Sequence, residues 1–109
     1  MELEKINVFR ETEGIKDKWK NFVVSNLNDH VVRLSVIQKD FHWHSHDQSD
    51  EMFYVIEGEL YVDFEDKTEK LSPTEMITVP KGVKHRTRSN TRTLLLCFEH
   101  KDNDVTGTN

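Results

Sequence analysis

Residues 41–51 are Phe-His-Trp-His-Ser-His-Asp-Gln-Ser-Asp-Glu, a segment unusually rich in histidine. Its histidines occupy every second position, at His42, His44 and His46. On an extended strand such a spacing projects every imidazole from the same face. Residues 47–50 have the composition of a turn, so the chain can reverse and bring Glu51 beside the imidazoles. Two histidines and a carboxylate are a common site for divalent transition metals, although a polar surface strand would show the same local pattern.

A second informative segment lies about thirty residues downstream, where residues 80–85 are Pro-Lys-Gly-Val-Lys-His. Proline fixes its own φ angle and glycine tolerates turn geometries that other residues avoid. A rigid turn of this kind would hold His85 in one direction at the start of a loop or strand. Taken alone, a histidine after a turn is more often a structural or surface residue than a ligand.

The rest of the chain is a series of short apolar runs separated by turn residues, which is typical of a sandwich or jelly-roll barrel. The expected strands cover residues 22–27, 31–37, 53–58, 59–64, 76–80 and 91–99. Asn28-Asp29 and residues 65–67 are expected turns. Before residue 22 the chain is polar, and the spacing of Ile15 and Trp19 predicts one helical turn.

Composition restricts the classes of protein to which the chain can belong. A length of 109 residues supports one domain. A net charge of −5 argues against nucleic acid as the partner. No stretch approaches the ~18 apolar residues of a membrane span, and the start lacks the pattern of a secretory signal. The single cysteine, Cys97, excludes an internal disulfide and favours the cytoplasm.

Together the two segments resemble the cupin superfamily, in particular small single-domain cupins of the RmlC-like jelly-roll type. The first cupin motif is matched by His44, His46, Glu51 and Gly58, and the second by Pro80, Gly82 and His85. The resemblance implies an all-β double-stranded β-helix and a metal site formed by His44, His46, Glu51 and His85. It implies one domain over residues 1–109, with the barrel at about 22–100, an N-terminal extension at 1–21 and a polar tail at 101–109. The chain departs from the family at Gln38, Thr74 and Ser89, which are turn and packing positions.

Other residues are weaker candidates for the site. His42 lies one step beyond the ligand pair, as a hydrogen-bonding group near the metal or as a histidine with no chemical role. Phe53 and Val55 share the parity of Glu51 and are candidates for an apolar pocket wall, with core packing as the alternative. The basic run from Lys81 to Arg92 could attract an anion toward the site, or could be a solvated strand face.

The resemblance implies one divalent transition-metal ion, which could be Fe, Mn, Ni, Zn, Co or Cu, and a small-molecule ligand or substrate. The expected activity is dioxygenase-like or sugar-phosphate isomerase-like, with Glu51 as a metal ligand or as a base. The alternative is a non-catalytic binding or sensor module in which the metal anchors the ligand. We also expect a homodimer, because small jelly rolls commonly cover an exposed sheet edge by pairing.

Overall fold

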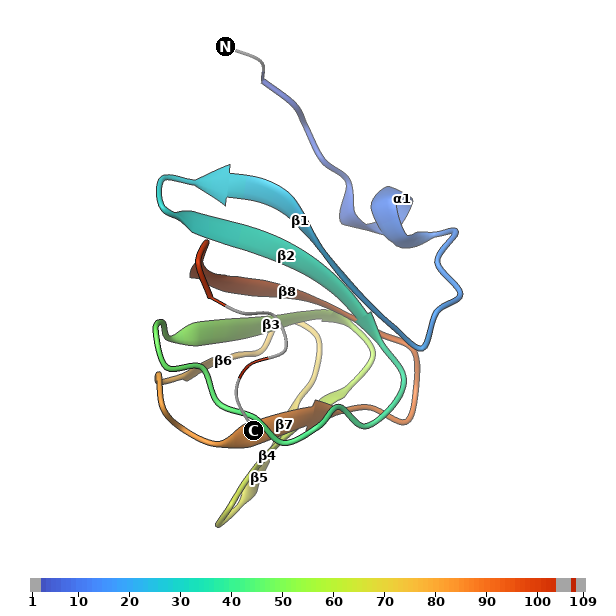
Figure 1. Ribbon diagram of the computed structural model, residues 1–109. Helices are drawn as coiled ribbons and strands as arrows, with labels where there is room; N and C mark the ends of the chain where they lie inside the picture. Colours follow the sequence, from blue (N-terminus) through green and yellow to red (C-terminus); the bar gives the residue numbers. More distant parts are fainter. Residues whose placement is uncertain (1–2, 104–106, 108–109) are drawn as a thin grey trace.

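The computed structural model describes residues 3–103 and 107, which form one short helix and two antiparallel sheets (Figure 1). The elements are α1 (Val8–Thr12), β1 (Trp19–Leu27), β2 (His30–Ile37), β3 (Glu51–Glu57), β4 (Leu60–Phe64), β5 (Thr68–Leu71), β6 (Met76–Val79), β7 (His85–Arg88) and β8 (Thr93–His100). Among the described residues, no helix is long and apolar enough to cross a membrane.

The two sheets face each other and enclose the core. The larger sheet has the strand order β1-β2-β8-β3-β6, and the smaller sheet has the order β5-β4-β7. The enclosed core includes Ile37, Phe53, Val55, Leu60, Val62, Leu71, Val79, Leu95 and Cys97. This arrangement confirms the predicted jelly-roll barrel, the double-stranded β-helix.

Along β2 and β8, successive side chains point alternately to the inner and the outer side of the larger sheet. Ser35 pairs with Leu95 and Ile37 pairs with Thr93, and these four side chains are buried on the inner side. The intervening residues of both strands, such as Leu34 and Leu96, form a second apolar layer on the outer side. Strands with apolar residues on both faces are typical of a sheet that is covered on both sides.

The helix lies earlier than the sequence pattern predicted. Asn7 caps its N-terminus, since the Asn7 side chain accepts a hydrogen bond from the Arg10 backbone N–H at 3.0 Å. Ile15 follows the helix and packs on the outer layer of the larger sheet, while Trp19 is the first residue of β1 and pairs with Ile37. The predicted helical turn through Ile15 and Trp19 is therefore wrong, because Trp19 is extended and pairs with β2.

The strands predicted from apolar runs are confirmed, with ends that shift by a few residues. Asn28 occupies the predicted turn between β1 and β2, with a positive φ of 56°. β1 begins at Trp19, three residues before the expected barrel boundary at residue 22. β5 was not predicted, because the residues Thr-Glu-Lys-Leu carry three exposed side chains and only Leu71 is buried.

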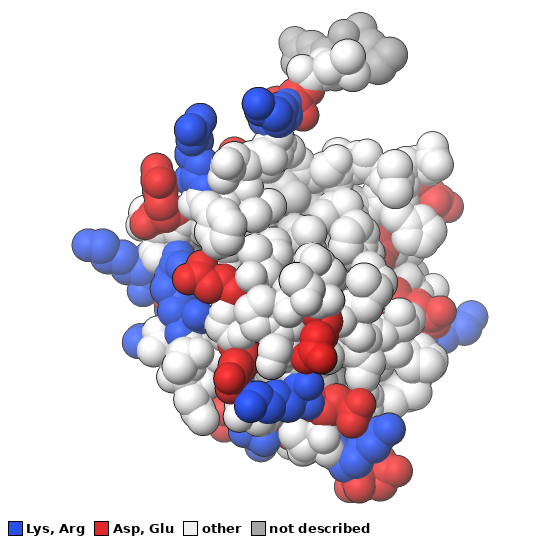
Figure 2. All heavy atoms as spheres, turned by 180° about the vertical axis from the view of Figure 1, so that it is seen from behind, with Lys and Arg blue, Asp and Glu red and all other residues white. Residues whose placement is uncertain are grey.

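Charged groups of both signs are interspersed on the surface. On the face seen from behind, Lys and Arg side chains lie beside Asp and Glu side chains toward the rim, and an uncharged area occupies the middle (Figure 2).

Candidate metal centre

The histidine segment is held against β7 and is not a regular strand. His44 and His85 form an isolated antiparallel bridge, in which each backbone N–H donates to the other residue's carbonyl at 2.9 Å. His44 and His46 are buried, whereas His42 is exposed. The ring centroids of His42 and His44 lie 5.3 Å apart and those of His44 and His46 lie 5.0 Å apart, so the three imidazoles are neighbours, as the spacing predicted, although the His42 ring is exposed to solvent.

Backbone carbonyls orient two of the imidazoles. His44 Nδ1 lies 2.8 Å from the His42 carbonyl oxygen, and His85 Nδ1 lies 2.9 Å from the Val83 carbonyl oxygen. A carbonyl can only accept, so each Nδ1 carries the proton and donates it. The Nε2 atom of each ring is thereby left as the lone-pair donor, which is the usual way in which proteins fix a metal-binding histidine.

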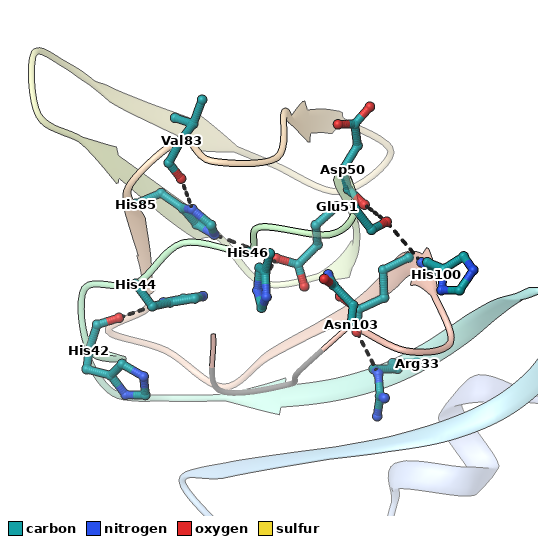
Figure 3. A network of polar contacts seen from close by, with 12 residues as sticks. Arg33, His42, His44, His46, Asp50, Glu51, Val83, His85, His100 and Asn103 are labelled. Atoms are coloured by element: carbon teal, nitrogen blue, oxygen red, sulfur yellow. Dashed lines mark hydrogen bonds and ion pairs between the residues drawn. The ribbon is translucent and has the colours of Figure 1, made fainter. Parts of the chain in front are cut away.

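Glu51 completes the cluster from the first position of β3 (Figure 3). Its Oε1 atom lies 3.2 Å from His46 Nε2 and 3.6 Å from His85 Nε2. One ligand atom from each of the four residues, His44, His46, Glu51 and His85, lies within 4.8 Å of every other. The structure therefore brings together the four residues that the cupin resemblance implied.

The geometry and chemistry of this cluster fit a divalent transition metal. Ligand atoms about 2.1 Å from an ion can be no more than ~4.2 Å apart, so the observed cluster would need only a small contraction. Among the described residues, Glu51 Oε1 and His85 Nε2 are buried atoms without a hydrogen bond. Buried polar atoms are rarely left in this condition, and a metal ion would satisfy both.

The electrostatics favour a neutral His44 imidazole and an ionised Glu51 carboxylate. Burial lowers the pKa of His44 to about 4, so this ring is neutral at pH 7. Burial alone would raise the pKa of Glu51, but its contacts with His46 and His85 outweigh that effect and lower it to about 2. Metal ligation requires a neutral imidazole and an ionised carboxylate, so His44 and Glu51 have the protonation states at neutral pH that a bound cation needs.

A second buried carboxyl group, Glu99 on β8, lies next to Glu51 and was missed in the sequence. Glu99 Oε1 accepts from Arg33 Nε at 2.7 Å and Glu99 Oε2 accepts from Asn103 Nδ2 at 2.9 Å. Burial and the charge of Glu51 raise the pKa of Glu99 to about 7. Glu99 follows the buried Leu95 and Cys97 at two-residue spacing, and this parity was the signal that could have identified it.

A cavity of about 30 Å³ adjoins the candidate metal ligands His44 and Glu51. It is lined by His44 and Glu51, by apolar side chains that include Trp19, Phe41 and Phe53, and by the polar residues Asn21 and Ser35. Phe53 therefore lies in a cavity wall, as the sequence suggested. Val55 is fully buried in the core outside that lining, and the exposed His42 contributes its carbonyl oxygen to the site. Asn21 was another polar residue that the sequence pattern did not identify.

The basic run between Lys81 and Arg92 is largely occupied by other contacts. Arg86 and Arg88 both donate to Asp63, at 2.8 and 2.7 Å, and Arg92 donates to the Thr12 carbonyl at 2.7 Å. Lys81 and Lys84 are exposed. These pairings favour the alternative in which the run is a strand face balanced by local acids.

A jelly-roll barrel with a buried cluster of three histidines and one glutamate defines a class of small β-barrel proteins with a candidate metal site. The chain matches the family described as Cupin domain over residues 30–99, and it belongs to that family. The match covers both motifs and the strands that carry them.

Individual relatives agree with this assignment. The chain is 48% identical over 96 residues to the uncharacterized protein YdbB of Bacillus subtilis, covering 87% of this chain and 85% of the relative. A cupin-2 domain containing protein from Shewanella frigidimarina has a similar solved structure, with a TM-score of 0.84, 30% identity and coverage of 88% and 94% of the two chains. The protein NMB1881 from Neisseria meningitidis has a TM-score of 0.79 and 31% identity, and the match covers 90% of this chain and all of that one (100%).

Proposed function

We propose that the protein binds one divalent transition-metal ion through His44, His46, Glu51 and His85, and that it acts on a small organic molecule held at this ion inside the barrel. The observation that carries the proposal is the convergence of four buried ligand atoms within 4.8 Å, next to a cavity that shares two of the same residues. With four protein ligands, a six-coordinate ion keeps two positions for small molecules.

Each part of the site would have a distinct role in the reaction. A bound ion would supply Lewis acidity, and a redox-active metal would add electron transfer. The three imidazoles hold the ion as neutral ligands, and Glu51 supplies the negative charge. Glu51 is also placed to accept a proton from a substrate in the cavity, since its carboxylate lines that space. The apolar walls restrict access of water to the reacting group.

Among the expected activities, the small cavity favours a dioxygenase-like reaction on a compact enolic molecule over sugar-phosphate isomerisation. Its lining is rich in aromatic side chains, whereas Arg86 and Arg88, which could have held a phosphate, pair with Asp63. The alternative is a binding or sensor module in which the metal anchors a ligand without turnover. The buried Cys97 thiol agrees with a protein that works in the cytoplasm.

Metal analysis of the purified protein tests the site. We expect about one transition-metal ion per chain, and we expect the double variant His44→Ala/His46→Ala to lose it. The matched control is His30→Ala/His100→Ala, which removes two histidines that lie outside the cluster. Equal metal content in the two double variants would overturn the assignment.

The same preparations separate an enzyme from a binding module. The metal-free protein is reconstituted anaerobically with each candidate metal and is then mixed with small enols, catechols and sugar phosphates. Turnover with oxygen uptake for an enol or catechol supports the dioxygenase-like activity. Ligand binding without turnover for every metal would support the sensor module instead.

A further inference from the structure

Asn21 is a polar residue on the inner face of β1, in a part of the barrel wall that combines apolar and polar side chains. Asn21 pairs with Ser35 across β1 and β2, two residues along from the pair of Trp19 and Ile37. Among the described residues, the buried Asn21 Oδ1 atom accepts no hydrogen bond. The side chain lines the same cavity as the metal ligands His44 and Glu51.

The buried Asn21 Oδ1 atom carries a free-energy cost that points to a missing hydrogen-bond donor. A buried carbonyl oxygen without a hydrogen bond destabilises a protein by about 1–3 kcal/mol relative to a satisfied one. An apolar side chain at residue 21 would avoid that cost and would match its neighbours Trp19 and Ile37. Buried groups of this kind therefore call for a partner from outside the chain, which is either an ordered water molecule or a ligand.

The shape of the cavity indicates what such a ligand looks like. Its volume of about 30 Å³ admits a group of only a few atoms, since one water molecule needs at least ~10–15 Å³ by the same measure. Trp19 and Phe41 stack with their ring centroids 5.2 Å apart and form a rigid wall of the cavity. A ligand in this space is compact, apolar in its middle and polar at its two ends.

We propose that Asn21 is a specificity-determining residue, which accepts a hydrogen bond from a hydroxyl group at the far end of a compact oxygen ligand bound at the metal centre. The ligand class is a short hydroxy acid or an enol with a second hydroxyl group. The near oxygen lies at the ligands His44 and Glu51, and the far hydroxyl group lies between Asn21 and Ser35. This inference rests on the proposed function, because it requires a metal ion in the site.

Binding to the Co²⁺-loaded protein tests the assignment without any assay of activity. The probes are matched pairs of acids with and without a terminal hydroxyl group: glycolate and acetate, 3-hydroxypropionate and propionate, and 4-hydroxybutyrate and butyrate. Each dissociation constant is measured from the change in the visible absorption of Co²⁺. In the wild type, we expect the hydroxy acid of at least one pair to bind about tenfold more tightly than its partner, the size of one well-placed buried hydrogen bond.

The variant Asn21→Leu is expected to reduce that preference to less than twofold. Asn21→Ala removes the amide without added bulk and provides a second test if the leucine variant does not fold. The control is Asn26→Leu on the same strand, where the asparagine is exposed, and it should keep the wild-type preference.

The outcomes separate this inference from the proposed function. A hydroxyl preference that persists in Asn21→Leu and Asn21→Ala would overturn the role of Asn21. The absence of any preference in a wild type with a normal Co²⁺ spectrum would overturn it as well, and would indicate that the amide holds only water. A wild type that gives no Co²⁺ spectrum at all would contradict the proposed metal site itself.

Discussion

Arg33 and Glu99, which are 66 positions apart in the sequence, form an ion pair inside the barrel with Nε and Oε1 2.7 Å apart. The Glu99 side chain is fully buried and also accepts from Asn103, so the pair links β2, β8 and the segment that follows β8. Because Glu99 lies next to Glu51, this pair supports the wall on which one metal ligand is placed. Figure 3 shows Arg33 and Asn103 beside the cluster.

Removing one partner of this ion pair should destabilise the protein strongly. We expect Arg33→Met to lower the free energy of unfolding by about 3 kcal/mol at pH 8. Without Arg33, the buried Glu99 either carries an uncompensated negative charge or stays protonated at a pH where a carboxyl group in the unfolded chain is ionised, and both states cost free energy. Urea denaturation of the metal-free protein measures the change. Lys101→Met, which removes an exposed cation near the same end of β8, should change stability by less than ~0.5 kcal/mol. A small effect in Arg33→Met would show that the pair contributes little.

The contrast between this pair and the metal ligands shows what the sequence can predict. His44, His46 and Glu51 lie within eight residues and match the first cupin motif, and His85 matches the second, so the resemblance implied that the four side chains converge. Arg33 and Glu99 come from separate strands, and their contact depends on the register of β2 against β8. Register over such a distance is set by the packing of the whole sheet and leaves no local pattern.

The segment after β8 shows a second limit. The sequence predicted only a polar tail at residues 101–109, but Asn103 is buried and Gly107 packs closely against His44. Residues 104–106 and 108–109 lie outside the described part of the chain. Polar composition indicates exposure only on average. Here Asn103 is buried, and its side-chain amide donates a hydrogen bond to the buried Glu99 carboxylate.

Gly107 provides a test of this contact with the metal centre. A Cβ atom at Gly107 would lie 2.5 Å from His44 Cδ2 and 2.9 Å from the Ser45 carbonyl oxygen, and the φ of 69° is itself unfavourable for other residues. Gly107→Ala should therefore displace either the tail or the His44 ring. We expect metal affinity to fall by about tenfold, as measured by competition with a chelating dye.

The matched control for this substitution is Gly14→Ala. Gly14 is exposed, and a Cβ atom there would meet nothing within 4 Å. This variant should bind metal as the wild type does. If the affinities of Gly107→Ala and Gly14→Ala were equal, the contact between Gly107 and His44 would have no influence on the site.

The buried ring of His44 predicts how the stability of the metal-free protein depends on pH. Its pKa is about 4 in the folded state and about 6.5 in the unfolded chain, so the unfolded state binds more protons between these values. Stability from this group is therefore present above pH 6.5 and is lost as the pH falls toward 4. Between pH 7 and pH 5 the loss is about 2 kcal/mol.

Comparison of variants isolates this contribution, because Glu99 titrates with the opposite sign. The pKa of Glu99 is raised to about 7, so its effect reduces stability as the pH rises through 4.5 to 7. His44→Gln keeps Glu99 and has no titrating group at residue 44. Urea denaturation at pH 7 and pH 5 should show a loss about 2 kcal/mol smaller in His44→Gln than in the wild type, while exposed His30→Gln should behave as the wild type.

We propose that the predicted homodimer forms by pairing of the outer face of the larger sheet with that of a second copy, and not by the sheet edge that the sequence suggested. Val32, Phe98 and Met52 form one row across three strands, and Leu96, Tyr54 and Met76 extend the next row to the edge strand β6. All of these side chains except the exposed Met76 are half-buried, and α1 covers only the neighbouring part around Leu34 and Leu94. A two-fold axis brings the same surface of two identical chains together, so two copies of this apolar face would bury each other.

A charge at the middle of this face should prevent the pairing. We expect light scattering to give a mass near twice the 12.9 kDa of one chain for the wild type. Tyr54→Glu should give the mass of one chain, because an unpaired carboxylate would be desolvated in the interface. Lys67→Glu, in the turn between β4 and β5, is the control and should remain dimeric. A wild type that stays near 13 kDa across a wide range of concentrations would contradict the dimer, and a dimeric Tyr54→Glu would place the interface elsewhere, such as at the free edges of β1 and β6.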